Sequence, residues 1–113
     1  MDARRRRLAV LAAAALLVPA AGAARADTVT VFAAASLQGC LDEVARAFEA
    51  GSGHRVRIAN AATPSLARQI EAGAPAQVFI AADAEWMRHV EDRGLLQSAP
   101  VAVAGNALVL VAP

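Results

Sequence analysis

The chain has 113 residues, a formal net charge of +1 and a single cysteine, Cys40, so it can form one modest core and no intramolecular disulfide. His54 and His89 stand alone, and no cluster of His and Cys has the spacing of metal ligands. The chain has no lysine and no basic patch with interleaved aromatic residues, so it lacks the usual sequence signature of a nucleic-acid-binding protein.

Residues 1–26 have the pattern of a cleavable secretory signal peptide. Arg4–Arg7 form a cationic head, an apolar stretch follows, and the small-x-small sequence at 24–26 predicts cleavage before Asp27. The apolar stretch is short for a membrane span and is broken by Pro19, so a cleaved signal is favoured over an uncleaved anchor. The arginine run leaves both Sec and twin-arginine export open. Once this segment is removed, six arginines and nine acidic residues remain, and the net charge becomes −3.

After the signal, strand and helix patterns alternate in the order βαβαβα, followed by a final β. Strands are predicted where β-branched or continuous apolar residues occur, at 28–31, 56–59, 77–81 and 108–111. Helices are predicted where apolar residues recur at a 3.6-residue period, at 37–50, 63–72 and 84–93.

Several side chains in these elements have predicted structural roles. Cys40, beside Leu41 on the apolar side of the first helix, is expected to be a small buried hydrophobe rather than a reactive thiol. Asp83 is expected to cap the third helix rather than to act as a catalytic acid. Ser36 and Thr63 stand where the N-caps of the first and second helices belong.

The alternation of strands and helices predicts an α/β fold with a parallel sheet and helices on its faces. Ligands of such sheets bind beyond the carboxyl ends of the strands. Small residues follow the first two predicted strands, at 33–36 and 60–63, and both runs lie on that edge. If the first two strands are neighbours, two hydroxyl-capped helix N-termini face one crevice.

Such a crevice favours an oxyanion ligand. Each helix start offers backbone N–H groups, a hydroxyl and the positive end of the helix dipole. The first turns contain no arginine or lysine, so binding would depend on neutral donors. Neutral donors suit a fully deprotonated oxyanion, whereas phosphate keeps a proton near neutral pH and would need an acceptor.

The sequence also leaves a catalytic alternative open, in which Ser36 is the nucleophile of a small exported hydrolase. A serine nucleophile needs a base within hydrogen-bond reach. His54 precedes the second strand and His89 lies inside a helix, so both are expected to be far from the strand ends. No nucleophile elbow, glycine-rich phosphate loop or HExxH helix is present.

Four blocks of sequence resemble the periplasmic molybdate-binding proteins, the solute receptors of molybdate ABC transporters. The first is Val-Thr-Val-Phe-Ala-Ala-Ala-Ser-Leu at 29–37, which resembles the start of the mature proteins of that family. The others are 65–76, then 78–83 with the Trp-Met pair at 86–87, and finally 105–106 with 108–113. Their order and spacing match over essentially the whole chain after the signal.

The resemblance implies a periplasmic binding protein-like (type II) fold, in which two lobes close on molybdate or tungstate. Residues 27–104 would form the first lobe, and 105–113 would begin a second lobe that is truncated here. Ser36 matches the family serine that supplies a hydroxyl and a backbone N–H. Thr63 matches a second hydroxyl residue, although Pro64 removes one neighbouring N–H, and Ser65 is the fallback for this second ligand.

The resemblance also implies that the protein is a monomer without catalysis or a cofactor, which passes its oxyanion to a membrane permease from the periplasm. The remaining ligands of the family are two backbone amides and a tyrosine hydroxyl from the second lobe. This chain has no tyrosine, so we expect it to hold about half of the site. A receptor for sulfate or another oxyanion remains an alternative. Gln77 replaces an acidic residue that is usual in the family.

Overall fold

The computed structural model describes residues 27–112, so the expected signal peptide at 1–26 lies outside the described residues. The elements follow the predicted alternation as far as the third helix. In chain order they are β1 (Thr28–Ala34), the 3-10 helix η1 (Ala35–Leu37), α2 (Gln38–Ser52), β2 (Arg55–Ala61), α3 (Thr63–Glu71), β3 (Val78–Ile80) and α4 (Ala84–Asp92).

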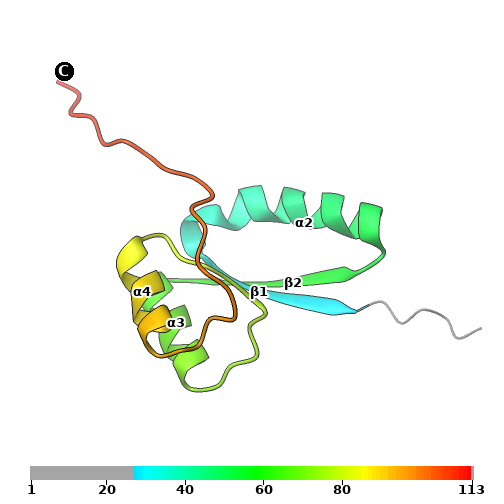
Figure 1. Cartoon of the computed structure of the whole chain (residues 1–113). Helices are drawn as coiled ribbons and strands as arrows, with labels where there is room; N and C mark the ends of the chain where they lie inside the picture. Colours follow the sequence, from blue (N-terminus) through cyan, green and yellow to red (C-terminus); the bar gives the residue numbers. More distant parts are fainter. Residues whose placement is uncertain (1–26, 113) are drawn as a thin grey trace, which may run out of the picture.

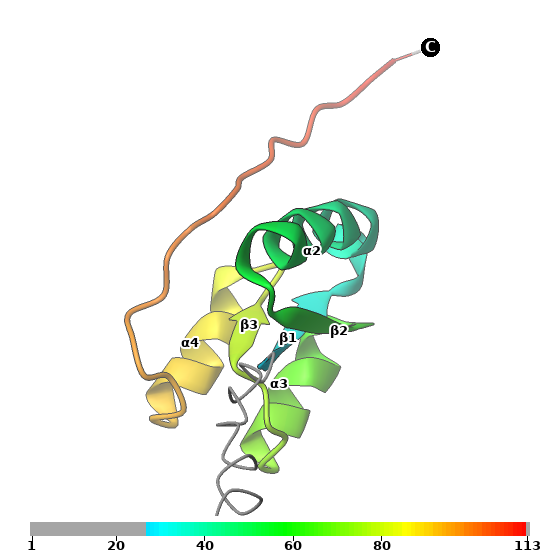
Figure 2. The same ribbon diagram turned by 90° about the vertical axis from the view of Figure 1, so that its right-hand side faces the viewer.

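The three strands form one parallel sheet in the order β2-β1-β3. Helix α2 lies on one face of this sheet, and α3 and α4 lie on the other (Figures 1 and 2). The predicted α/β architecture with helices on both faces is therefore confirmed. Because β1 is central, its partners β2 and β3 occupy opposite edges.

The core lies between the sheet and the pair α3 and α4. The carboxyl half of β1 is buried along its length, as expected of a strand with parallel neighbours on both sides. Leu66 of α3 and Val90 of α4 are each only 1% exposed. The buried apolar residues are Val31, Phe32, Ala33, Ala34, Leu66, Ala67 and Val90.

Helix α2 does not bury the apolar face that its sequence predicts. Val44 is 56% exposed and Phe48 is 47% exposed, and Cys40 is exposed as well. The prediction that Cys40 is a buried hydrophobe is therefore wrong. The helix instead turns Leu41, Ala45 and Glu49 toward the protein, where all three are half-buried.

A hydrogen bond joins α2 to β2 on the side of the helix that faces the protein. The main-chain N–H of Val56, at an edge of the sheet, donates to the Glu49 carboxylate at 2.7 Å. Since β2 is an edge strand, such outward N–H groups have no neighbouring strand to pair with. Glu49 satisfies one of them and links its side of the helix to β2.

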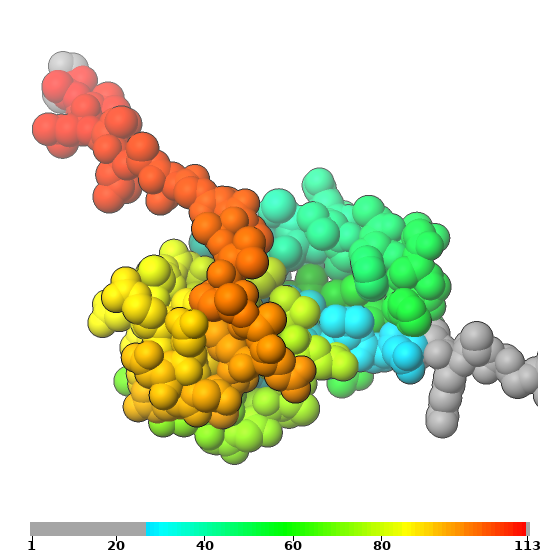
Figure 3. Space-filling model, viewed as in Figure 1, coloured from blue at the N-terminus to red at the C-terminus, as the bar shows by residue number. Residues whose placement is uncertain are grey.

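The strand predicted at 108–111 is not formed: among residues 27–112 no strand lies beside this stretch, and an isolated strand leaves its backbone polar groups unpaired. Residues 95–112 contain no helix or strand, and the last part of this segment extends away from the body (Figure 3). Leu108 is 96% exposed and Leu110 is fully exposed. Within residues 27–112, no helix has the length and apolar character needed to cross a membrane.

Gln77 joins the start of β3 to β1 by two hydrogen bonds with one residue. Its main-chain N–H donates to the Thr30 carbonyl at 2.9 Å. Its side-chain Oε1 accepts from the Thr30 N–H at 2.7 Å. The side chain thereby completes the pairing of Thr30 with the edge strand, which gives this glutamine a structural role.

Gln77→Ala is expected to lower the free energy of unfolding by about 1 kcal/mol, because it leaves the Thr30 N–H without its protein acceptor. Urea denaturation followed by circular dichroism measures the change. The matched control is Gln69→Ala, which removes an exposed side chain whose hydrogen bond within residues 27–112 is to Ser65 on the same helix, and which should leave stability unchanged. Equal effects of the two substitutions would contradict the role assigned to Gln77.

Candidate functional site

Ser36 and Thr63 occupy equivalent places at the carboxyl edge of the sheet. Ala34 of β1 pairs with Ala61 of β2 at the last position of the ladder. Ser36 follows Ala34 by two residues, and Thr63 follows Ala61 by two residues. Adjacent strands lie only about 4.8 Å apart, so the two strand exits that bear these hydroxyls are close neighbours. The two hydroxyls were expected to share one crevice only if the first two strands are neighbours, and β1 and β2 are neighbours in the sheet.

Neither hydroxyl residue is a helix cap, contrary to prediction. Ser36 lies inside η1, whose N-cap position is Ala34, and α2 has Leu37 at that position. Neither position makes a side-chain capping bond. Ser36 is exposed, and its hydroxyl makes no hydrogen bond within residues 27–112. The 3-10 turn separates the end of β1 from α2 and leaves this side chain on the surface.

Thr63 is the first residue of α3, and Ala62 occupies the N-cap position. Its side chain is buried, with only 5% of the residue exposed. The Thr63 hydroxyl accepts a hydrogen bond from the Ala82 main-chain N–H at 3.1 Å. Pro64 lies in the first turn, where an N–H has no partner within the helix, so the proline costs the helix no internal bond.

Ser65, the fallback hydroxyl, differs from Thr63 in its surroundings. It is exposed on α3 and accepts a hydrogen bond from the Gln69 side chain at 3.3 Å. This bond lies along the surface of the helix between positions i and i+4. The structure therefore leaves Thr63 as the buried hydroxyl at the start of α3.

The end of β3 lies at the same edge of the sheet as the ends of β1 and β2. Ile80 pairs with Ala33, so Ala81 is level with Ala34, and Asp83 follows two residues later. The Asp83 carboxylate accepts from the Trp86 N–H at 2.9 Å, which confirms that Asp83 caps the third predicted helix. Its negative charge is thus used at the N-terminus of α4, where the helix dipole stabilises it.

Asn60 is a polar residue at this edge to which the sequence patterns assign no role. Its side-chain amide donates to the Ala33 carbonyl at 3.4 Å, across the ladder between β2 and β1. The side chain is partly buried. In the sequence, Asn60 could have been noticed as the one amide among small and apolar residues at the end of a predicted strand. Only the pairing of the strands shows that it contacts the Ala33 carbonyl.

The electrostatics of the edge depend on neutral groups. The stretches 33–41 and 60–67 contain no arginine or lysine. Helix α2 has 15 residues and α3 has nine, and both begin at this edge, where the positive ends of their dipoles lie. Backbone N–H groups and two hydroxyls are therefore the donors on offer, an arrangement that can bind an anion without a formal countercharge.

Neither histidine is placed to activate Ser36. His54 immediately precedes β2, at the amino edge of the sheet, whereas Ser36 follows the carboxyl end of β1. His89 lies on α4 and contacts Glu71 at 3.2 Å and Arg93 at 3.1 Å. The geometry required of a serine nucleophile and its base is not present at this edge.

Glu71, His89 and Arg93 form a polar cluster that joins the ends of α3 and α4. The Arg93 Nε–H donates to Glu71 Oε1 at 2.6 Å, and His89 Nε2 lies 3.2 Å from Glu71 Oε2. The hydrogen bond from Arg93 lowers the pKa of Glu71 below its usual 4.5, and the contact with His89 lowers it further. Within residues 27–112, no group of three or more His, Cys, Asp and Glu side chains could hold a metal ion.

The ionised form of Glu71 stabilises the fold, because its pKa is lower in the folded chain than in the unfolded chain. This contribution is complete above pH 4.5 and is lost as the pH falls through the lowered pKa. Glu71→Gln should therefore lower the melting temperature at about pH 7, and this effect should shrink as the pH falls below 4.5 through the lowered pKa of Glu71. Thermal unfolding over a series of pH values measures this, and Glu91→Gln on the exposed surface of α4 is the control. A difference that persists in acid would contradict the assignment.

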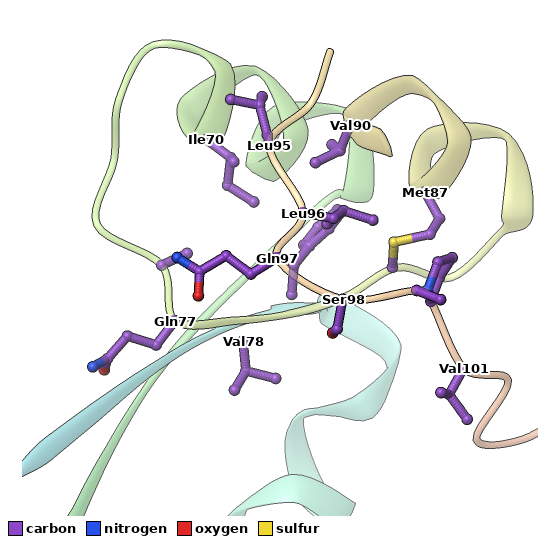
Figure 4. A pocket seen from close by; sticks show the side chains of 14 residues that line it. Ile70, Gln77, Val78, Met87, Val90, Leu95, Leu96, Gln97, Ser98 and Val101 are labelled. Carbon is purple, nitrogen blue, oxygen red and sulfur yellow. The ribbon is translucent and has the colours of Figure 1, made fainter. Parts of the chain in front are cut away.

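A cavity lies away from the carboxyl edge of the sheet (Figure 4). It has a volume of about 700 Å³ and lies between α3, α4, β3 and the segment that follows α4. Apolar side chains such as Ile70, Met87 and Leu96 line it, with Gln77 and Ser98 among the polar ones. Neither Ser36 nor Thr63 contributes to its lining, and none of its lining residues is charged.

Residues 29–113 match the model of a family described as bacterial extracellular solute-binding proteins. Molybdate-binding protein ModA of Escherichia coli K12 is 45% identical over 112 residues, which cover 96% of this chain and 44% of that protein. Molybdate-binding protein ModA of Haemophilus influenzae is 38% identical over 87 residues, which cover 75% of this chain and 34% of that protein. The chain thus spans less than half the length of these curated relatives.

Two solved structures have a similar fold. A periplasmic molybdate-binding protein of Azotobacter vinelandii superposes with a TM-score of 0.57 and 30% identity, over 58% of this chain and 29% of that one. A substrate-binding domain assigned to a molybdenum ABC transporter of Clostridium difficile superposes with a TM-score of 0.59 and 26% identity, over 60% and 30%. The periplasmic binding protein-like (type II) fold implied by the resemblance is confirmed for the matched part of the chain.

Proposed function

The chain belongs to the family of bacterial extracellular solute-binding proteins, and on that basis we propose that it captures molybdate or tungstate for uptake by an ABC transporter. The observation that supports this most strongly is the 45% identity, over 96% of the chain, to a protein named for molybdate binding. The ligand is cargo rather than a cofactor. The protein performs no catalysis, acts as a monomer, and passes its ligand to a membrane permease.

Ser36 and Thr63 are the proposed ligand-binding residues of this chain. Their equivalent places after two paired strands support a shared contact with one tetrahedral dianion. Each hydrogen bond from a neutral donor to such a charged ligand contributes about 1.5–3 kcal/mol. Backbone N–H groups of the same turns supply further donors, so the anion is held without a basic side chain.

The proposal extends to the place of the site in the whole receptor. Residues 27–104 form the first lobe, and 105–113 begin the crossover to a second lobe that supplies the remaining donors. Export through the pattern at residues 1–26 places the receptor in the periplasm, where one of its solved structural relatives is also found. A site shared between two lobes encloses the ligand when they close, and pocket size then separates molybdate from the smaller sulfate.

Isothermal titration calorimetry tests the function, with the protein expressed from the complete open reading frame that encodes this chain. Molybdate and tungstate should bind with similar affinity and at least about 100-fold more tightly than sulfate, a difference of about 2.7 kcal/mol. Phosphate, which carries a proton near neutral pH, should give no heat. Equal affinity for molybdate and sulfate, or no binding of molybdate, would refute the proposal.

A further inference from the structure

The hydrogen bond from Ala82 to Thr63 crosses the end of the central strand. Thr63 follows β2 and Ala82 follows β3, and these strands lie on opposite sides of β1. The 3.1 Å bond therefore joins two strand exits that are not neighbours in the sheet. Ala33 and Ala34, at the end of β1 between these two exits, are 0% and 3% exposed.

This bond restricts where the Thr63 proton can point. A hydroxyl has one proton to donate and two lone pairs that accept. The Ala82 N–H occupies a lone pair of Thr63, so the hydroxyl proton must point away from that amide. Thr63 is also β-branched, which limits the rotation of its side chain. Within residues 27–112 the hydroxyl makes no other hydrogen bond, so its proton is available to a ligand.

Ser36 provides the contrast. Ser36 is exposed and its hydroxyl makes no hydrogen bond within the described part of the chain, so no protein group fixes the direction of its proton. Thr63 is buried, and its hydroxyl is held by a main-chain group from another loop. Of the two proposed ligand residues, Thr63 is thus aligned before the ligand arrives, and pre-aligned groups lose less freedom on binding.

We propose that the main-chain N–H of Ala82 is a positioning group, which holds the Thr63 hydroxyl as a pre-aligned donor toward an oxyanion at the carboxyl edge of β1 and β2. This inference rests on the proposed function of that edge. By this proposal, the turn after β3 contributes to ligand affinity through Thr63, although the turn itself does not contact the ligand. It also favours ligands whose facing oxygen has no proton of its own, since such an oxygen can only accept.

The test removes the Ala82 N–H and measures molybdate affinity by calorimetry in the full-length protein. Replacing Ala82 by lactic acid changes the amide to an ester and keeps the side chain, and Ala82→Pro is a second, genetically encoded version. Either change should weaken binding by about 3- to 10-fold, because the hydroxyl loses its alignment but not its proton. Thr63→Val should weaken binding by about 10- to 100-fold, and Thr63→Ser, which keeps the hydroxyl, should remain close to wild type.

Combining Thr63→Val with removal of the Ala82 N–H shows whether that N–H acts on affinity through Thr63 or through the general structure of the turn. In the Thr63→Val background, removal of the Ala82 N–H should cause no further loss of affinity, because its target is already gone. An equal loss in both backgrounds, or wild-type affinity of the ester variant, would overturn the inference while the proposed function stands. Failure of the wild-type protein to bind molybdate would instead refute the function itself.

Discussion

Ser36→Ala is expected to weaken molybdate binding by about 10- to 100-fold and to leave the free energy of unfolding unchanged. The hydroxyl is exposed and makes no hydrogen bond within residues 27–112, so its removal costs the fold nothing. Its proposed role is a hydrogen bond to a dianion, and such a bond contributes about 1.5–3 kcal/mol. Calorimetry with molybdate and urea denaturation of the same sample measure the two quantities.

Ser65→Ala is the matched control for this substitution. Ser65 is also an exposed serine near the start of a helix at this edge, but its hydroxyl is engaged by Gln69 on the surface of α3. Its loss should change neither molybdate affinity nor stability. If Ser65→Ala weakened binding as strongly as Ser36→Ala, the fallback hydroxyl would be a ligand and the assignment of Thr63 would need revision.

Leu66→Ala is expected to have the largest effect on stability, a loss of about 2–5 kcal/mol in the free energy of unfolding. Leu66 is 1% exposed and is one of only two large side chains that are fully buried among the described residues. Domains of this size are stable by about 5–15 kcal/mol, so the substitution removes a large part of the total. The shift in the urea midpoint measures it.

The control is Leu110→Ala, measured like Leu66→Ala on the 113-residue chain, in which Leu110 is a fully exposed leucine of the segment after α4. It removes the same atoms from a side chain that buries nothing, so the urea midpoint should not move. A comparable loss of stability in both variants would show that the segment around Leu110 packs against the body of the protein. That result would contradict the exposed placement of this segment.

Local patterns account for the parts of the fold that the sequence predicts. The β-branched run of β1 and the apolar run of β3 indicate strands. Successive side chains of a strand point to opposite faces of the sheet, so a strand covered on both faces is apolar at consecutive positions. Asp83 indicates the start of α4 because an N-cap contacts a residue only three positions away. The paired hydroxyls could be foreseen because the carboxyl ends of parallel strands meet at one edge.

Contacts between distant residues account for what the sequence could not show. The side of α2 that faces the protein carries Glu49, whose carboxylate accepts from the Val56 N–H of the edge strand, a contact that the helix pattern does not contain. The apolar periodicity of α2 predicted that Cys40 lies in the core, whereas the structure has it on the surface. The strand predicted at 108–111 had the right composition but has no neighbouring strand in the described residues.

The sequence by itself determined the order of the elements, the parallel architecture, the family and the two hydroxyls at the carboxyl edge. These depend on local periodicity, on chain connectivity and on short motifs, all of which are properties of neighbouring residues. Only the tertiary structure decided that Thr63 is buried and held by Ala82, 19 positions away, while the Ser36 hydroxyl makes no hydrogen bond within residues 27–112. Burial and hydrogen-bond direction depend on which elements pack together, and sequence spacing does not specify that.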